Sequence, residues 1–505
     1  MGTKEFKIVV TTDVHGSIYS TNFSDGNDEN MGLSRLSSYL KDLRKTNDVI
    51  LIDNGDVNQG SALVTYTNKY EKENIMSKAF NKLSYDYINI GNHDFNYGSK
   101  FLMDYINETN GKCITSNILY DNKPIGQSQI LKNKNRDLNI GLVGVVTDYI
   151  ENWEKESNLT DIDILSVFET VEKEVKKIRE EVDQLIVFYH GGLERDPDTG
   201  EKTETLTGEN IGYRLLTEIE GIDLLITGHQ HRSFVNNVNN TLVVQCTNAL
   251  TEFIELTYVD GQFTVSIKDT GEYEIDENFL QDFQEIYNNL QDWLDESIGE
   301  DLDEELIIED IIEAQINKHP FVSLVNQAQL DITGADISVS SLYDTTNGFK
   351  KTITYRDLVS NFPFPNTLVV KTITGKVLKE YLEQNAEYWI EKDGKIEVNP
   401  TFLQPKRQIF NYDMADGIDY TIKVSNPVGD RIVDLTIDNV PVEKDKEYKI
   451  VMNNYRASGG GDFNMLIELE TLYESTEEMI DVMNKYIREN QPIEFEHKDN
   501  IKIIL

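Results

Sequence analysis

This sequence of 505 residues has few cysteines, few basic residues and no long apolar run. Cys113 and Cys246 are the two cysteines, and they form no CxxC pair. This argues against a thiolate-bound structural zinc ion. Two thiols in so long a chain are as compatible with free, buried side chains as with a disulfide, so they do not settle the redox compartment.

Basic residues are outnumbered by acidic ones, with 47 Lys and Arg against 89 Asp and Glu and a formal net charge of −42. This balance argues against sequence-independent binding to nucleic acid polymers or anionic membranes, because such binding requires basic patches. An anionic small molecule can still bind where divalent ions supply the positive charge.

No apolar segment approaches the roughly 20 residues that span a bilayer. The N-terminus has no basic region followed by a long apolar stretch, so no signal peptide is visible. We therefore expect a cytoplasmic protein, or a secreted or cell-surface one if a leader has been removed. Its oligomeric state stays open.

The length and the 39% hydrophobic content predict a folded protein of two or three domains. Up to about residue 265, apolar runs alternate with helical segments, which is an α/β pattern. An amphipathic helical segment and an acidic stretch follow, and a second α/β pattern begins near residue 319. We predict domains over residues 1–275 and 319–505, joined by a helical acidic linker over residues 276–318.

Five of the seven histidines lie in four short motifs, each directly after an apolar run, and a fifth such motif contributes an aspartate. The runs are short and rich in β-branched residues, as in strands buried on both faces of a sheet. The carboxyl ends of such strands hold the ligands and catalytic groups of α/β proteins. We therefore predict a metal site at one sheet edge, built from Asp13 and His15 after residues 6–12, Asp56 after 48–55, Asn92 and His93 after 85–91, His190 after 184–189, and His229 and His231 after 222–228.

The ligand types in these motifs point to two divalent ions. Asp13 and His15 are two residues apart, so both can point to one side of an extended segment, and Asp56 can place one oxygen on each ion. A metal pair roughly 3.5–4 Å apart binds a phosphoryl oxygen, lowers the pKa of a bridging water and stabilises the displacement, which is the chemistry of phosphoester hydrolysis. A nitrogen and oxygen set without cysteine suits Mn²⁺ or Zn²⁺, and also Fe or Co, better than Ca²⁺.

The motifs TTDVHG, DNGDVNQGS, GNHDFNYG, YHGG and TGHQH, in that order, resemble the calcineurin-like metallophosphoesterase domain of the 5′-nucleotidase family. FPFPNTL, NYDMADGIDYTI with NPVGDRI, and NNYRASGGGDF resemble the family's C-terminal substrate domain. The resemblance covers nearly the whole chain. It implies a four-layer α/β/β/α N-terminal domain, a separate α/β C-terminal domain that binds the nucleoside, and a hinge rotation between them located at residues 275–320.

The resemblance also assigns roles to the N-terminal residues. One ion would be held by Asp13, His15, Asp56 and His231, and the other by Asp56, Asn92, His190 and His229. His93 would then contact a phosphoryl oxygen or assist the leaving group. 5′-Nucleotidases usually have an Asp three positions after this histidine, where this sequence has Asn96. Because Asn does not hold an imidazole protonated, the departure favours the 2′,3′-cyclic-nucleotide 2′-phosphodiesterase/3′-nucleotidase branch.

In the family a nucleobase stacks between two aromatic rings of the C-terminal domain. The matching positions are Tyr412 and Tyr455, with Phe410 as the alternative for the first ring. The glycines at 459–461 would let backbone approach the ligand, and Asp462 would accept a hydrogen bond from a ribose hydroxyl. This sequence has one more Gly here than the usual form, so the position of Asp462 stays open.

The resulting hypothesis is a two-metal hydrolase of nucleotide phosphoesters, with 2′,3′-cyclic nucleotides and 3′-nucleotides ahead of 5′-nucleotides. One alternative is hydrolysis of UDP-sugars or other pyrophosphates, or of a sulfur-linked substrate, by the same fold. Another is a non-catalytic nucleotide-binding protein, which the complete set of ligands disfavours.

Overall fold

The computed structural model describes residues 5–24, 26–133, 137–204, 206–259, 261–299, 302–364, 366–404 and 407–505. The chain forms two compact units, Met1–Leu290 and Gln291–Leu505. The boundaries predicted after residues 275 and 318, and the hinge near them, stay predictions. No helix among the described residues is long and apolar enough to cross a membrane, and the expected cytoplasmic location stays a prediction.

The first unit contains two six-stranded sheets and one small sheet. The first sheet has the order β15 (Gln262–Asp269), β14 (Glu252–Val259), β1 (Glu5–Thr11), β2 (Asn47–Asp53), β3 (Tyr87–Ile88) and β4 (Lys112–Cys113). The second has the order β12 (Phe234–Val238), β13 (Thr241–Gln245), β11 (Leu224–Thr227), β10 (Gln184–His190), β8 (Leu138–Val146) and β7 (Gln129–Asn133). The small sheet consists of β6 (Lys123–Pro124), β5 (Ile118–Tyr120) and β9 (Ile162–Ile164).

The two large sheets pack face to face. One buried cluster joins Ile8 and Val10 of β1 to Ile186 and Phe188 of β10. Since side chains alternate along a strand, Val9 points to the other face of its sheet, where it is also fully buried. Both faces of β1 are therefore covered, as its unbroken apolar run predicts.

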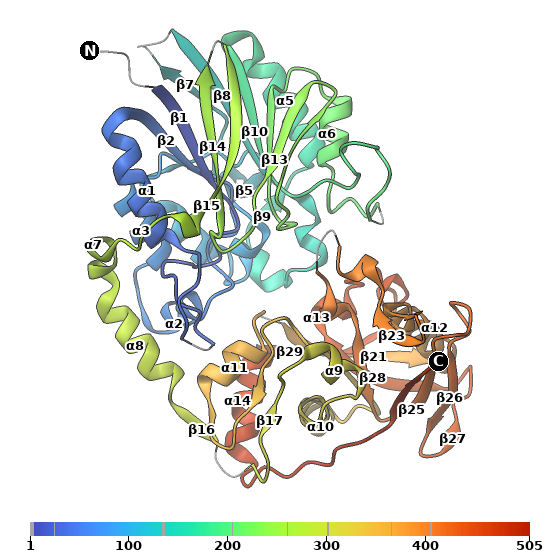
Figure 1. Cartoon of the computed structure of the whole chain (residues 1–505). Coiled ribbons are helices and arrows are strands. Elements are labelled where there is room, and N and C mark those ends of the chain that lie inside the picture. The colour runs from blue at the N-terminus through green and yellow to red at the C-terminus, as the bar shows by residue number, and fades with distance from the viewer. Residues whose placement is uncertain are drawn as a thin grey trace. The chain divides into compact units, whose positions relative to one another are not determined.

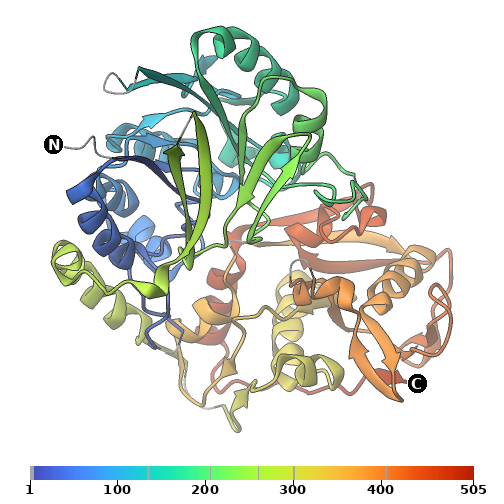
Figure 2. The ribbon, with the colours of Figure 1, turned by 45° about the horizontal axis from the view of Figure 1, so that its top comes forward.

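Helices cover the outer faces of both sheets, on opposite sides of the unit (Figures 1 and 2). The second sheet packs on α5 through a cluster that includes Val143, Val187 and Val171. The order helix, sheet, sheet, helix is the predicted layering. The helices of this unit are α1 (Leu33–Thr46), α2 (Ala62–Tyr70), α3 (Ile75–Leu83), α4 (Ser99–Glu108), α5 (Val167–Ile178), α6 (Gly212–Glu218), α7 (Glu277–Leu280) and α8 (Gln284–Leu294), the last of which extends across the division between the units.

Parallel pairing brings the predicted motifs to one edge of these sheets. β2 pairs in parallel with β1 and β3, and β10 pairs in parallel with β8 and β11. Asp13, Asp56 and Asn92 follow the carboxyl ends of β1, β2 and β3, while His190 ends β10 and His229 follows β11. The loops after β1 and β2 are joined by backbone hydrogen bonds, including one of 2.9 Å from the N–H of His15 to the carbonyl of Asp56.

The second unit is built on a five-stranded sheet of β24 (Asp413–Asp416), β18 (Ile337–Ser341), β28 (Glu447–Asn453), β21 (Thr367–Thr374) and β29 (Thr471–Glu478). A four-stranded sheet has the order β27 (Val440–Pro441), β26 (Ile432–Ile437), β25 (Asp419–Lys423) and β30 (Ile501–Ile504). The helices are α9 (Ile311–Ile316), α10 (Pro320–Thr333), α11 (Tyr355–Asn361), α12 (Gly375–Asn385), α13 (Asn454–Ala457) and α14 (Met479–Glu489).

The acidic stretch after α8 contains two short strands. β16 (Ser297–Gly299) pairs with β20 (Ile353–Thr354), and β17 (Leu306–Ile307) pairs with β19 (Gly348–Phe349). A hairpin of β22 (Trp389–Lys392) and β23 (Lys395–Val398) completes the described strands of this unit. These pairings attach residues 297–307 to the second unit.

Candidate metal centre and nucleoside site

Six of the seven residues predicted to bind metal lie in two groups. In each group, one nitrogen or oxygen atom from each residue lies within 4.8 Å of the others, and the groups are Asp13, His15 and His231, and Asp56, His190 and His229. His190 connects the two groups, because its Nε2 lies 3.1 Å from Asp56 Oδ2 and 3.9 Å from Asp13 Oδ1.

Asn92 Oδ1 is buried and has no hydrogen-bond partner among the described residues, while the buried Asp56 Oδ2 and His190 Nε2 lie 3.1 Å from each other and have no further partner there. A buried polar atom without a partner costs about 1–3 kcal/mol. A carboxylate oxygen, an amide oxygen and an imidazole nitrogen are ligand atoms for divalent transition metals. The residues therefore fit a metal site, and the unpartnered oxygen of Asn92 suits the ligand role predicted for it.

Hydrogen bonds orient three of the histidine rings. His15 Nδ1 donates to the carbonyl of Gln59 at 2.8 Å, and His190 Nδ1 donates to the carbonyl of Asn54 at 2.7 Å. In both rings Nε2 is then the nitrogen that faces the site, and it would bind an ion in the deprotonated state. His229 uses the opposite atom, since its Nε2 lies 2.9 Å from Glu209 Oε1, which leaves Nδ1 as the ligand nitrogen.

Five of the predicted ligands have backbone in the left-handed region, which L-residues rarely adopt. Their φ angles are 53° at Asp13, 48° at His15, 59° at Asp56, 66° at His229 and 54° at His231. Such residues cost on the order of 1–3 kcal/mol each and cluster at functional sites. The tight turns after the strands thus hold these side chains in place at the expense of local stability.

Asp94 fixes the turn that holds Asp56. Its buried carboxylate accepts hydrogen bonds from the backbone N–H groups of Gly91, Asp56, Val57 and Asn58, at 2.8–3.1 Å. Gly91 leaves room for Asp56, because a Cβ at Gly91 would collide with Asp56 Oδ1. Asp94 lies inside the GNHDFNYG motif, but we did not predict a role for it.

The charges of the cluster stabilise one another. Burial alone would raise the pKa of Asp13, but His190 and His231 hold that pKa below its ordinary value. His190 and His93 hold the pKa of Asp56 well below its ordinary range against the same effect of burial. Burial would lower the pKa of His190, but Asp56 and Asp13 raise it to about 10. Both carboxylates are therefore ionised at neutral pH, the form that binds cations.

His93 lies beside this cluster. Its backbone N–H donates to Asp56 Oδ1 at 2.7 Å, and its ring centroid lies 5.6 Å from that of His15. Its Nδ1 lies 2.7 Å from Asn96 Oδ1. The pair proposed from the motif is thus in contact, with Asn96 in the position of the family's aspartate.

Two residues that we did not predict lie at the same edge. The ring of Trp153 stacks on His229, with centroids 5.5 Å apart and planes 26° apart. Glu154 Oε2 accepts a hydrogen bond of 2.6 Å from Asn96 Nδ2. Both residues belong to the segment after β8, and the apolar run at residues 139–146 is the sequence signal for a further strand end at this sheet edge.

In the second unit, Phe410 and Tyr455 form a partly exposed aromatic pair. Their ring centroids lie 6.2 Å apart with an interplanar angle of 71°. Tyr412 is 0% exposed and stacks on Tyr388 at 5.1 Å, so its ring lies in the core. The burial of Tyr412 favours Phe410, the alternative for the first ring, and the assignment stays a prediction.

The glycine-rich turn after α13 lies next to Tyr455. A Cβ at Gly460 would lie 2.5–2.6 Å from atoms of the Tyr455 ring, so only glycine allows this approach. Asp462 is exposed, with φ of 67°. Its predicted role as an acceptor for a ribose hydroxyl stays a prediction.

Arg456 connects the two segments that carry the exposed rings. It is 2% exposed, pairs with Asp413 at 2.6 Å, and donates to the carbonyl of Phe410 at 3.1 Å and to the carbonyl of Gly460. Arg456 therefore fixes the backbone beside both Phe410 and Tyr455. It lies within the quoted motif NNYRASGGGDF, but its burial could not be read from the sequence.

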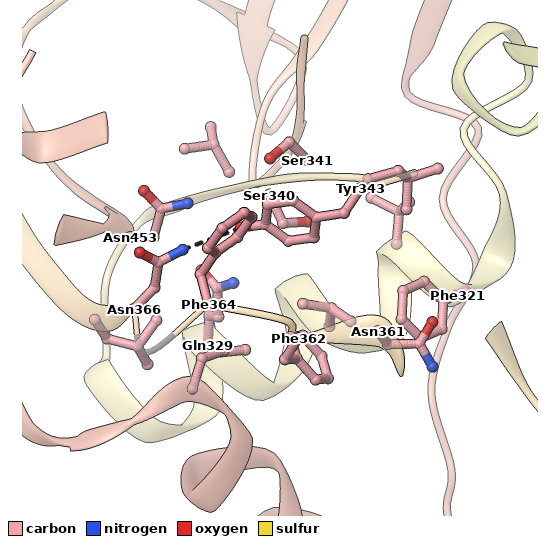
Figure 3. Close-up of a pocket in the computed structure, with 16 residues that line it drawn as sticks. Phe321, Gln329, Ser340, Ser341, Tyr343, Asn361, Phe362, Phe364, Asn366 and Asn453 are labelled. Atoms are coloured by element: carbon pink, nitrogen blue, oxygen red, sulfur yellow. Dashed lines mark hydrogen bonds between the residues drawn. The ribbon is translucent and has the colours of Figure 1, made fainter. Parts of the chain in front are cut away.

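A pocket in the same unit lies beside the segment 361–366 that resembles the family's substrate loop (Figure 3). Tyr343, Phe364 and Asn366 gather on one side of it, and Asn366 Nδ2 donates to the Tyr343 hydroxyl at 3.1 Å. Phe321 and Phe362 line the other side.

Comparison with known proteins gives the same division of the chain. Residues 6–233 match the calcineurin-like phosphoesterase family, and residues 304–468 match the 5′-nucleotidase C-terminal domain. The solved structure of a candidate 5′-nucleotidase from Staphylococcus aureus, in complex with alpha-ketoglutarate, is 31% identical with a TM-score of 0.91, and the match covers 99% of this chain and 100% of that one. This chain belongs to the 5′-nucleotidase family. The predicted family and two-domain α/β architecture are confirmed.

Two curated relatives in this family are nucleotide phosphoesterases. The 2′,3′-cyclic-nucleotide 2′-phosphodiesterase/3′-nucleotidase of Haemophilus influenzae is 25% identical over 96% of this chain and 84% of its own length. The trifunctional nucleotide phosphoesterase protein YfkN of Bacillus subtilis is 24% identical over 96% of this chain, which spans 38% of that protein's length. The family's calcineurin-like fold implies divalent metal ions, and the two ligand groups are the candidate sites for them.

Proposed function

We propose that this protein is a two-metal hydrolase of nucleotide phosphoesters. The observation that carries the proposal is the gathering of six of the seven predicted ligands into two groups at one sheet edge, with the buried oxygen of the seventh, Asn92, having no hydrogen-bond partner among the described residues. Asp13, His15, Asp56 and His231 would hold one ion, and Asp56, Asn92, His190 and His229 the other. Mn²⁺ and Zn²⁺ fit this set, as do Fe and Co.

Two such ions, when bound, supply positive charge for the phosphoryl oxygens and activate a water. The protein's own groups have the other tasks. His93 contacts the phosphoryl group or protonates the leaving oxygen through Nε2, because Nδ1 is engaged by Asn96. Phe410 and Tyr455 bind the nucleobase, and Arg456 holds the backbone beside both rings.

We propose 2′,3′-cyclic nucleotides and 3′-nucleotides as the preferred substrates. Asn96 supports this preference, because it contacts His93 at the position where the family's 5′-nucleotidases usually have an aspartate. The similarity to the Haemophilus enzyme points the same way. The 31% identity to the Staphylococcus protein favours 5′-nucleotides as the second candidate.

The test is to strip purified protein of metal, restore Mn²⁺ or Zn²⁺ separately, and assay 2′,3′-cAMP, 3′-AMP, 5′-AMP and UDP-glucose in parallel. Turnover of the first two above the others is expected. Turnover of 5′-AMP alone would contradict the inference that Asn96 favours 2′,3′-cyclic nucleotides and 3′-nucleotides. Turnover of UDP-glucose alone would favour a pyrophosphate hydrolase. No turnover with any metal would leave a nucleotide-binding protein without catalysis.

A further inference from the structure

His93, Asn96 and Glu154 form a continuous chain of hydrogen bonds in the first unit. Asn96 Oδ1 lies 2.7 Å from His93 Nδ1, and Asn96 Nδ2 lies 2.6 Å from Glu154 Oε2. We infer that Glu154 is a positioning residue for His93 and acts through the side-chain amide of Asn96. The inference rests on the proposed phosphoester chemistry, because it concerns the histidine assigned to the leaving group.

Glu154 determines which way the Asn96 amide faces. A carboxylate accepts hydrogen bonds and has no proton to donate, so the NH₂ group of Asn96 must face Glu154. The reverse orientation would bring Asn96 Oδ1 against the carboxylate oxygen and would leave the NH₂ group facing His93. The carboxylate of Glu154 therefore keeps the Asn96 amide oriented so that its acceptor, Oδ1, faces the His93 imidazole.

The amide orientation in turn fixes the proton on His93. Since Oδ1 of an amide can only accept, His93 Nδ1 must carry the hydrogen of their bond. Nε2 is then the ring nitrogen that can exchange a proton with a leaving oxygen. An aspartate in place of Asn96 would do this alone, whereas an asparagine does it only if something else prevents its amide from turning.

Glu154 is itself held by its surroundings. Its Oε1 accepts from Asn158 Nδ2 at 2.8 Å and from the backbone N–H of Lys155 at 2.9 Å. Asn158 Nδ2 also donates to the carbonyl of Asn96 at 2.9 Å. Both carboxylate oxygens therefore face donors. A glutamine at position 154 has only one acceptor oxygen, so it cannot accept hydrogen bonds on both sides. Glu154→Gln therefore removes the constraint on the Asn96 amide while the side chain keeps its size.

The first test compares two leaving groups in Glu154→Gln and in a matched control, Glu156→Gln. Glu156 is an exposed glutamate in the same segment, with the same charge. With a nucleotide, whose alkoxide leaving group needs a proton, we expect kcat of Glu154→Gln to fall about 10-fold or more. With p-nitrophenyl phosphate, whose leaving group needs none, kcat should change less than about threefold, and Glu156→Gln should match the wild type with both.

The second test exchanges the two groups. Asn96→Asp places two carboxylates in contact at the position of the 2.6 Å bond, and we expect this variant to lose activity through their repulsion. Adding Glu154→Gln lets the introduced amide donate to the introduced carboxylate, while the amide oxygen still accepts from Asn158 and Lys155. The double variant should recover most of the wild-type kcat. Recovery of this kind distinguishes positioning from a general effect on folding.

A third measurement does not depend on turnover. In ¹⁵N-histidine-labelled, Zn²⁺-loaded protein, the His93 signal, assigned by its loss in His93→Ala, should show hydrogen on Nδ1 and should change in Glu154→Gln. If Glu154→Gln behaves like Glu156→Gln with both substrates and leaves this signal unchanged, the inference is wrong. If wild-type protein hydrolyses no phosphoester, the proposed function fails and the ¹⁵N signal alone decides the role of Glu154.

Discussion

The buried carboxylate of Asp94 accepts a hydrogen bond from the backbone N–H of Asp56 at 3.1 Å. It also accepts from the next two backbone N–H groups and from Asn58 Nδ2 at 2.9 Å. The residue assigned to both ions is thus placed by an acidic side chain that binds neither.

Asp94→Asn should lower metal affinity or activity about 10- to 100-fold, the usual effect of losing an outer partner of a ligand. The amide would turn its NH₂ group toward N–H donors and leave one of them unsatisfied. Metal affinity measured by titration calorimetry checks this, with the exposed Asp42→Asn on α1 as the control. Equal affinities in the two variants would show that the Asp56 turn holds without Asp94.

The partly exposed pair Phe410 and Tyr455 and the buried Tyr412 predict different effects of substitution on KM. Phe410→Ala and Tyr455→Ala should each raise KM for nucleotides about 5- to 150-fold with little change in kcat, because stacking contributes about 1–3 kcal/mol per base. Tyr412→Leu, which removes the aromatic face, should leave KM of the folded protein unchanged, since that ring lies in the core. Steady-state kinetics on 3′-AMP and 2′,3′-cAMP measure this. An increase in KM for Tyr412→Leu alone would restore the original assignment.

The buried ion pair of Arg456 and Asp413 predicts strong coupling between the two residues. Arg456→Met should lower the free energy of unfolding of the second unit by about 3–5 kcal/mol, because it leaves a buried carboxylate without its partner. The double variant with Arg456→Met and Asp413→Asn should lose less free energy of unfolding than the sum of the losses in the two single variants. Urea denaturation followed by tyrosine fluorescence measures this. Additive losses would mean that the two side chains act independently.

Glu204 predicts a pH dependence of stability. Burial, with the nearby charge of Glu209, raises its pKa from the ordinary 4.5 to about 7 against hydrogen bonds from Asn210 and Gln230. The folded protein therefore keeps a proton that the unfolded chain loses, and this contribution to stability falls as the pH rises from about 4.5 to 7.

Glu204→Gln should flatten the dependence of Tm on pH across this window. Tm of the variant and of the wild type at pH 5 and pH 8, measured by calorimetry, provides the comparison. The exposed Glu201→Gln serves as the control. If both variants keep the slope of the wild type, the slope arises from another group.

The grouping of the ligand candidates could be predicted because each candidate follows a strand whose apolar run is visible in the sequence. Parallel pairing brings the candidates of each sheet to one edge, but the contact between residues as distant as Asp13 and His231 also requires the two sheets to pack face to face. Asp94 lies within the GNHDFNYG motif, but its role depends on backbone N–H groups that come together only in the folded turn. Glu154 and Trp153 lie after an apolar run in the sequence, but a glutamate and a tryptophan there form no recognisable motif.

The aromatic site could not be settled from sequence for a different reason. Phe410 and Tyr412 lie two residues apart in the same motif and are chemically similar. A short 3₁₀ turn over Ile409–Asn411 precedes β24, and packing against Tyr388 and Trp389 buries the ring of Tyr412. Such packing depends on residues more than twenty positions away in the chain.

The central claim is that Asp56 serves two ions in one hydrolytic site. The most direct measurement is the metal content of protein dialysed against Mn²⁺ or Zn²⁺, determined by mass spectrometry together with turnover of 2′,3′-cAMP. We predict two ions per wild-type chain, and in Asp56→Asn fewer than two ions and more than about 100-fold lower turnover. An Asp56→Asn variant that keeps both ions and full turnover, or a wild-type protein that binds no ion, would contradict the claim.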